Sequence, residues 1–350
     1  MALVAALCSF VMTAHADGTN LTAAQAWAAL TNFSLPQPPM AWQTNPPSQD
    51  QLLKFDDEQA VQAGKLADLS RNFYTQFADD LNSSRARTTE IQALQMAVHF
   101  GATNRLRDLN LREQMVIADT NAPESLRYEL RIDQLGRELQ TSLAAGADRN
   151  AEMEKLGRTL VKEFPDGPLG YQLLLDVTVS CDLAKMQELA ELMVNSGGPS
   201  ELTGYGKGLL NQLKVIGQPS PIEFTAGNGL PINSTTLSNK VVLVDFWAVW
   251  CPICVEAIPD LKKLYDRYHA SGLEIVGINF DDETNQAQRF IKEKDMSWPQ
   301  YFGGYGADNK YGREYGAVLP YVWLVDKKGI VRDIHGRVDL EAKVAKLMAE

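Results

Sequence analysis

The chain has 350 residues, more than one hydrophobic core usually organises, so two domains are expected. Hydrophobic residues make up 45% and charged residues 22%, which excludes a wholly disordered, collagenous or coiled-coil protein. The formal net charge of −11 argues against nucleic acid as the main partner, because phosphate binding requires a basic surface. The four cysteines, too few for a disulfide-built scaffold of this size, are Cys8, Cys181, Cys251 and Cys254.

Residues 1–16 have the pattern of an export signal. The apolar run from Ala2 to Ala14 leads into Ala14-His15-Ala16, a small-x-small cleavage pattern. The run is shorter than the roughly 20 residues of a membrane-spanning helix. A buried N-terminal helix is the alternative interpretation. The pattern favours a signal peptide and a mature chain that is periplasmic or otherwise exported and soluble, with its thiols in an oxidising compartment.

Residues 17–47 are rich in Ala and Pro, and the prolines at 36–47 predict an extended, polyproline-like segment. Ser48 and Gln51 predict a helix start with a capping box. From residue 48 to 214 the apolar spacing is helical, and breaks at 121–123, 165–168 and 196–199 predict six or seven helices. This region is an irregular all-α bundle or a tetratricopeptide-like array of helical hairpins.

The pattern changes at 216–221, which places the second domain at 215–350. Apolar runs predict strands at 241–247, 273–280, 321–325 and 330–335. Amphipathic stretches predict helices at 252–270, 285–294 and 339–348. Alternation of this kind predicts an α/β domain in which a sheet lies between helices.

The pair Cys251 and Cys254 follows a buried strand and opens a helix. At the start of a helix, unpaired N–H groups and the macrodipole favour a thiolate, so Cys251 is the expected nucleophile. Cys254 lies one turn further and can close a small disulfide ring as the resolving thiol. Half of a zinc site, a structural disulfide and a peroxidatic cysteine are the alternatives. A zinc site would need further spaced ligands, which the sequence lacks, so no metal is expected. A disulfide that closes so small a ring would add little to the stability of the fold. A peroxidatic site would have Thr or Ser where this chain has Ala248.

The C-terminal region resembles the exported TlpA/ResA/CcmG-like thiol–disulfide oxidoreductases of the thioredoxin superfamily. The resemblance covers about 215–347. It depends on the segments Val244-Asp245-Phe246-Trp247-Ala248-Val249-Trp250-Cys251-Pro252-Ile253-Cys254 and Leu319-Pro320-Tyr321-Val322-Trp323-Leu324-Val325-Asp326, with Pro259 in the intervening helix. It implies a thioredoxin-like fold for residues 215–350.

The resemblance also implies roles for single residues. Pro320 matches the family's cis-proline, which would bring Leu319 beside the sulfurs to pair with a substrate segment. Asp245 matches a buried acid that accepts a proton from Cys254. An ordinary edge-strand proline and a buried polar plug are the respective alternatives. Trp250 would either cover the active-site turn or be a core residue. The expected substrate-binding residues are Trp250, Pro252, Ile253, Leu319 and Pro320.

The implied activity is reduction of protein disulfides through the Cys251/Cys254 dithiol, with no cofactor. The resemblance implies a membrane thiol transporter as electron donor. The dipeptide Pro252-Ile253 contains no His to stabilise the thiolate further, which favours a mildly reducing potential. A helical scaffold with an accessory redox domain, and a disulfide oxidase or isomerase, are the alternative functions. The sequence identifies neither the substrate nor the oligomeric state.

Three further features have ordinary interpretations. Cys181 lies in an apolar helical stretch, which predicts a buried, inert thiol. The stretch Gly204-Tyr205-Gly206-Lys207-Gly208 is not a phosphate loop, because no strand precedes it. The acidic run Asp281-Asp282-Glu283 predicts a solvated helix start.

Overall fold

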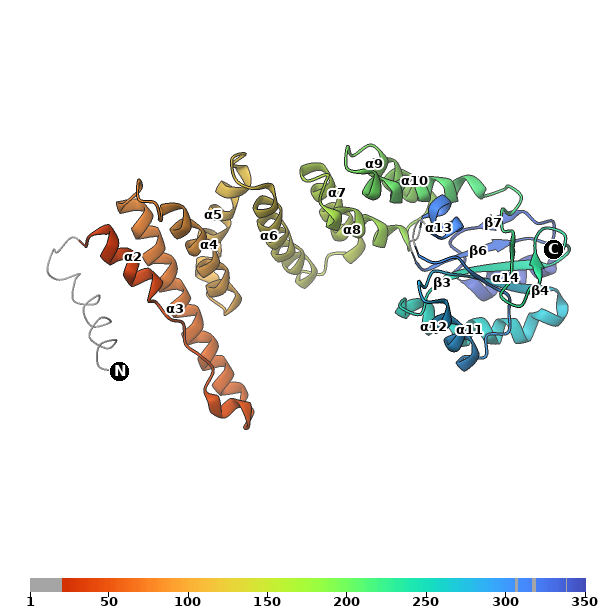
Figure 1. Ribbon diagram of the computed structural model, residues 1–350, viewed down its shortest axis with the longest axis horizontal. Coiled ribbons are helices and arrows are strands. Elements are labelled where there is room, and N and C mark those ends of the chain that lie inside the picture. Colours follow the sequence, from red (N-terminus) through yellow and green to blue (C-terminus); the bar gives the residue numbers. More distant parts are fainter. Residues whose placement is uncertain (1–20, 306–307, 317–318, 338) are drawn as a thin grey trace. The chain divides into compact units, whose positions relative to one another are not determined.

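The computed structural model describes residues 21–305, 308–316, 319–337 and 339–350 (Figure 1). The expected signal peptide, residues 1–16, lies outside them. Contacts divide the chain into two compact units, 1–137 and 138–350, with the division inside helix α6. The predicted boundary at 214/215 stays a prediction. No helix in the described residues has the length and apolar content needed to cross a membrane.

The described part of the first unit contains helices and the loops between them, and no strand. Ser48 begins α3 with the predicted capping box, in which Ser48 and Gln51 each bond the other's backbone N–H. The expectation of a wholly extended Pro-rich segment is wrong at Met40–Gln43, a 3₁₀ turn entered from Pro39. The helices of this unit are α2 (Ala23–Thr31), α3 (Gln49–Gln76), α4 (Ser83–His99), α5 (Leu106–Ala118) and α6 (Glu124–Ala144), with 3₁₀ turns at Met40–Gln43 and Thr103–Arg105.

The second unit begins with two helical hairpins, α7 (Arg149–Glu163) with α8 (Pro168–Thr178), and α9 (Leu183–Val194) with α10 (Ser200–Val215). Residues 48–214, all of them described, therefore form eight α-helices, α3 to α10, and not six or seven. The turns at 100–102 and 179–182 contain no proline, so the sequence gives a weaker signal for them.

A five-stranded sheet with the order β5-β4-β3-β6-β7 follows the hairpins. Strands β3, β4 and β5 are parallel, whereas β6 and β7 are antiparallel to their neighbours. Together with the helices, this confirms the predicted α/β thioredoxin-like fold. The sheet strands are β3 (Val241–Trp247), β4 (Leu273–Asn279), β5 (Gln300–Phe302), β6 (Tyr321–Val325) and β7 (Val331–Asp333). A separate two-stranded ribbon consists of β1 (Phe224–Thr225) and β2 (Pro231–Ile232). The helices are α11 (Pro252–Tyr268), α12 (Thr284–Glu293), α13 (Lys310–Tyr315) and α14 (Leu340–Ala349), with a 3₁₀ turn at His269–Ser271.

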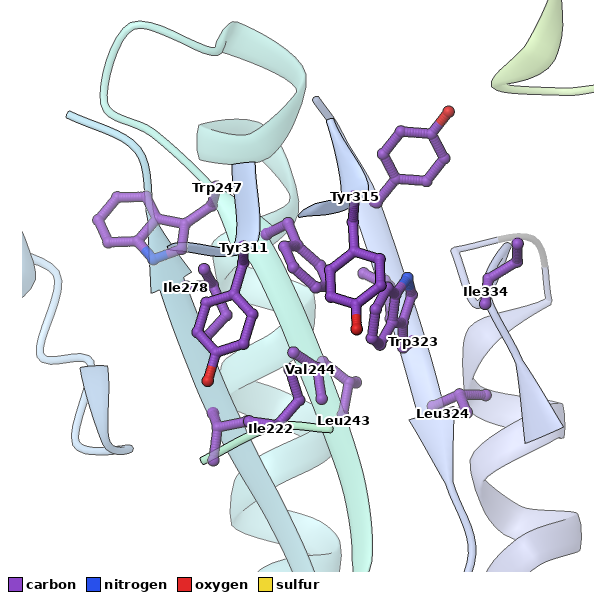
Figure 2. Packing of buried hydrophobic residues seen from close by; sticks show 14 of the residues in the cluster. Ile222, Leu243, Val244, Trp247, Ile278, Tyr311, Tyr315, Trp323, Leu324 and Ile334 are labelled. Carbon is purple, nitrogen blue, oxygen red and sulfur yellow. The ribbon is translucent and has the colours of Figure 1, made fainter. Parts of the chain in front are cut away.

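One apolar core joins the two hairpins to the sheet. Leu174 of α8, Met186 of α9 and Leu209 of α10 belong to the same buried cluster as Val244 and Trp323 of the sheet. Figure 2 shows the sheet side of this cluster, where aromatic rings gather over β3 and β6. Every residue of β3 is buried, as expected for a central strand covered on both faces. The helices α7 to α10 and the sheet are therefore held by a common hydrophobic contact.

Candidate active site

The site lies where the central strand β3 ends. The loop after Trp247 is tied to the neighbouring strand, because the N–H of Val249 donates to both carboxylate oxygens of Asp281 at 3.1 and 3.0 Å. Asn279 also donates to Asp281, at 2.7 Å. Asp281 is buried, so its assignment to a solvated helix start is wrong. Its carboxylate fixes the entrance to the Cys-x-x-Cys turn.

Cys251 is the N-cap residue of α11, and its Sγ accepts a hydrogen bond from the N–H of Cys254 at 3.3 Å. The two sulfurs form a disulfide with a Cα–Cα separation of 5.3 Å. Cys251 retains 6% exposure, whereas Cys254 has 0%. Because a helix N-terminus stabilises negative charge, the sulfur of Cys251 is placed to be a thiolate when the pair is reduced. The more exposed residue of the pair is thus the one whose sulfur is placed to ionise.

Apolar side chains surround this turn on the surface. Trp250 is 52% exposed and Ile253 is 59% exposed, while Pro252 is exposed at the first helical position. The alternative of Trp250 as a core residue is therefore wrong. Its ring makes an edge contact with Tyr305 at a centroid distance of 5.6 Å. Exposed aromatic and aliphatic surface beside a reactive sulfur is suited to contact another polypeptide.

Asp245 lies within β3 and is fully buried. Burial raises the pKa of this carboxyl to about 6, and the nearby guanidinium of Arg337 opposes the rise. Oδ1 accepts a hydrogen bond from Arg337 at 3.1 Å, whereas Oδ2 has no hydrogen-bond partner within the described residues. A carboxyl with this pKa is mostly ionised at neutral pH and retains a free acceptor oxygen.

Arg337 joins this acid to the redox turn. While one of its nitrogens contacts Asp245, another donates to the carbonyl of Ile253 at 3.5 Å. Ile253 directly precedes Cys254, so one side chain spans the buried acid and the resolving cysteine. Sequence reasoning missed Arg337 and gave Asp281 a different role. Neither residue lies in a recognisable motif. In the sequence, Asp281 is only a charged residue after an apolar strand, and Arg337 is only a charged residue after a glycine.

The peptide bond between Leu319 and Pro320 is cis, as the resemblance implied. Strand β6 begins directly after it and pairs antiparallel with β3, with Phe246 opposite Tyr321 and Asp245 opposite Val322. This register brings Pro320 to the end of β3 from which the Cys-x-x-Cys loop leaves. The predicted substrate-binding residues therefore come from two segments that meet at one end of the sheet, and their roles stay predictions.

Cys181 is not part of this arrangement. It lies half-buried in the turn between α8 and α9, so the expectation of a position within a helix is wrong. Burial raises the pKa of its thiol. A thiol that resists ionisation is a poor nucleophile.

Comparisons with known proteins find relatives of this chain, and the family match covers the region that carries the site. The Redoxin family matches residues 216–348. The thiol-disulfide oxidoreductase ResA of Bacillus thuringiensis subsp. konkukian (strain 97-27) is 30% identical over 124 residues, 35% of this chain and 70% of the relative. The thiol:disulfide interchange protein DsbE of Yersinia pestis is 29% identical over 126 residues, 35% of this chain and 64% of the relative.

Among solved structures, the thioredoxin domain of a thiol-disulfide oxidoreductase from Bacteroides vulgatus has 28% sequence identity and a TM-score of 0.34. The match covers 38% of this chain and 97% of that domain. The Redoxin match contains both cysteines, Asp245, Pro320 and Arg337, whereas the helices before residue 216 lie outside it.

Proposed function

We propose, from the premise that this chain belongs to the ResA-like thiol–disulfide oxidoreductases of the thioredoxin superfamily, that it reduces disulfide bonds of exported proteins. The observation that carries the proposal is the position of Cys251. Cys251 is the more exposed residue of the pair, its sulfur caps the start of α11, and it lies at the sheet end where the cis-proline segment begins.

The reaction uses the dithiol as a two-electron donor. The Cys251 thiolate attacks one sulfur of the substrate disulfide, forms a mixed disulfide and expels the first substrate thiolate. Cys254 then gives its proton to the Asp245 carboxylate through a water molecule and attacks the Cys251 sulfur. This step forms the Cys251–Cys254 disulfide and releases the second thiolate, to which the proton passes through solvent. The substrate has gained two electrons.

The sequence supports the proposed direction and compartment. Pro252-Ile253 supplies no cationic side chain that would stabilise a strongly acidic thiolate, so a reducing couple is favoured. An outside dithiol must then reduce the pair again, and a membrane thiol transporter is the proposed donor. Residues 1–16 are the proposed export signal. The segment Leu319–Pro320 and the exposed residues Trp250, Pro252 and Ile253 are the proposed contacts for the substrate chain.

The test combines a potential with a trapped complex. Wild-type protein is expected to reduce insulin, and its Cys251/Cys254 couple to equilibrate at a potential nearer thioredoxin than a strong oxidant. Cys251→Ser should abolish the reaction, Cys254→Ser should accumulate a mixed disulfide, and Cys181→Ser is the matched control that retains activity. A strongly oxidising potential would identify an oxidase. Full insulin reduction by Cys251→Ser would contradict the proposal.

A further inference from the structure

The glycine-rich stretch Gly204–Gly208 is not used by the proposed chemistry, yet it makes a close contact near the site. It lies in α10, beside α13 in the same unit (Figure 1). A Cβ added to Gly208 would lie 2.7 Å from the backbone nitrogen of Gly316 and 2.9 Å from the carbonyl carbon of Tyr315. Real Cβ atoms do not approach backbone so closely, so only glycine allows this contact. The backbone of α10 lies directly against the end of α13.

Two side chains on the next turn of α10 bond the same end of α13. Asn211 donates to the carbonyl of Glu314 at 2.9 Å, and Gln212 donates to the carbonyl of Tyr315 at 2.8 Å. The last carbonyls of a helix have no partner within that helix, so such donors stabilise its end. Gln212 is only 2% exposed. Removing its N–H would therefore leave a buried acceptor unsatisfied.

The chain that α10 holds leads into the cis-proline segment. Gly316 follows Tyr315 with a positive φ of 79°, and the cis bond at Leu319–Pro320 lies a few residues further on. The Tyr315 ring packs edge-on against Trp323 of β6 at a centroid distance of 5.0 Å (Figure 2). On the far side of the proline, Tyr321 lies with its hydroxyl 3.4 Å from that of Thr178 in α8. The helices contact the chain on both sides of Pro320.

We infer that α10 positions the substrate groove. Gly208 and Gln212 hold the end of α13, and this anchor keeps Leu319–Pro320 in place beside the Cys251 sulfur. The inference rests on the proposed function, because it requires that segment to receive the substrate chain. A protein disulfide must align its backbone with the segment before a sulfur reaches Cys251. A small disulfide needs only access to the sulfur. A displacement of about 1 Å can cost on the order of a hundredfold in rate.

The first experiment compares two glycines of the same helix in the full chain. Gly208→Val introduces the clash, and Gly204→Ala is the matched control because a Cβ there meets nothing within 4 Å. We measure kcat and KM for insulin, the exchange rate with 5,5′-dithiobis(2-nitrobenzoate), and the Cys251/Cys254 potential. For Gly208→Val the insulin KM should rise about tenfold or more, with the small-disulfide rate and the potential unchanged. Gly204→Ala should match wild type in all readouts.

A second variant keeps the test decisive if Gly208→Val does not fold. Gln212→Met keeps the length and apolar stem of the side chain and removes the donor to Tyr315. It should raise the insulin KM by about threefold to tenfold, again without changing the small-disulfide rate. An unchanged insulin KM in a folded Gly208→Val or in Gln212→Met would overturn the inference. The inference would also be overturned if the variants lost activity equally toward insulin and the small disulfide and the Cys251/Cys254 potential shifted.

Failure of the proposed function would be visible in the wild-type chain itself. If that chain oxidises protein thiols and does not reduce insulin, the proposed direction is wrong. The same comparison of KM is then made with reduced ribonuclease, because the groove is required in either direction. The inference itself is judged by the variants, and it fails if they bind the protein substrate as wild type does.

Discussion

Of the carboxylates that the molecule buries, Glu90 of the first unit and Asp245 of the second differ in how their oxygens are used. In the first unit, Oε1 of Glu90 accepts from Arg71 at 2.6 Å and from Arg112 at 3.1 Å, and Oε2 accepts from Tyr74 at 2.6 Å. In the second unit, Asp245 has one bonded oxygen and one without a hydrogen-bond partner among the described residues.

The difference separates a structural acid from one available for chemistry. A buried carboxylate that accepts hydrogen bonds on both oxygens is held in place by its donors, whereas one with an oxygen unbonded can still accept from a further donor. Asp245 is incompletely bonded, and burial raises its pKa to about 6. The proposed second step of the reaction requires a proton acceptor at this place. Substituting each acid should therefore affect different properties.

The largest effect is expected from Glu90→Ala. The change leaves Arg71, Arg112 and the Tyr74 hydroxyl without their shared acceptor, which should lower the free energy of unfolding of the first unit by about 3–5 kcal/mol. Urea unfolding followed by circular dichroism measures the loss. Asp68→Ala is the control, since Asp68 pairs with Arg105 but is half exposed and should cost less than about 1 kcal/mol. A simultaneous loss of insulin reduction would contradict a purely structural role.

The next effect concerns Asp245→Asn and the dependence of stability on pH. The folded-state pKa of about 6 exceeds the ordinary value of 3.8, so the folded protein binds this proton more tightly than the unfolded chain. The resulting stabilisation is complete below about pH 3.8 and is lost as the pH rises through about 6. It amounts to about 3 kcal/mol. Urea unfolding of the disulfide form at pH 4 to 8 should show this fall in wild type and a smaller one in Asp245→Asn. If wild type and Asp245→Asn gave identical curves of stability against pH, the prediction would be refuted.

A smaller effect is expected from Arg337→Met. The cation opposes the rise in the pKa of Asp245, so its removal should raise that pKa further. The pH profile of mixed-disulfide resolution should then move upward by about one unit. Rapid-quench kinetics over a pH series provides the measurement. Arg332→Met is the matched control because Arg332 pairs with Asp326 and Glu350. A profile that stays in place would show that Arg337 does not act on Asp245.

Local patterns predicted much of the site and of the fold. Strands β3 and β6 have the bounds expected from their apolar runs, and the capping box at Ser48 forms as written in the sequence. The Cys-x-x-Cys turn and the cis bond before Pro320 are also short-range signals. Such features depend on neighbours within a few positions, so their residues are sufficient to indicate them.

The contacts that were missed join distant segments. Arg337 meets Asp245 across 92 positions, and Gln212 meets Tyr315 across 103. In the sequence, Gly208 shows only that this position has no side chain. The fold shows the reason, which is the backbone at the end of α13. A repeat of the helical hairpins was also unclear from the sequence. Pro165, Gly170 and Tyr171 of one hairpin recur with the same spacing as Pro199, Gly204 and Tyr205 of the next. Two copies do not establish a period among irregular helices.

The smallest effect is expected from cutting the chain just after α6, the helix in which the two units divide. The Ala145–Asp148 segment between α6 and α7 is a turn, and a protease recognition site inserted there would cut the chain without touching the core that joins α7–α10 to the sheet. Insulin reduction by the C-terminal fragment should stay within about twofold of wild type, because neither the redox pair nor the α10 contacts are lost. A fragment that loses activity would show that the first unit contributes to catalysis beyond the stability that Glu90 supplies, and the contrast between the two acids would no longer separate structure from chemistry.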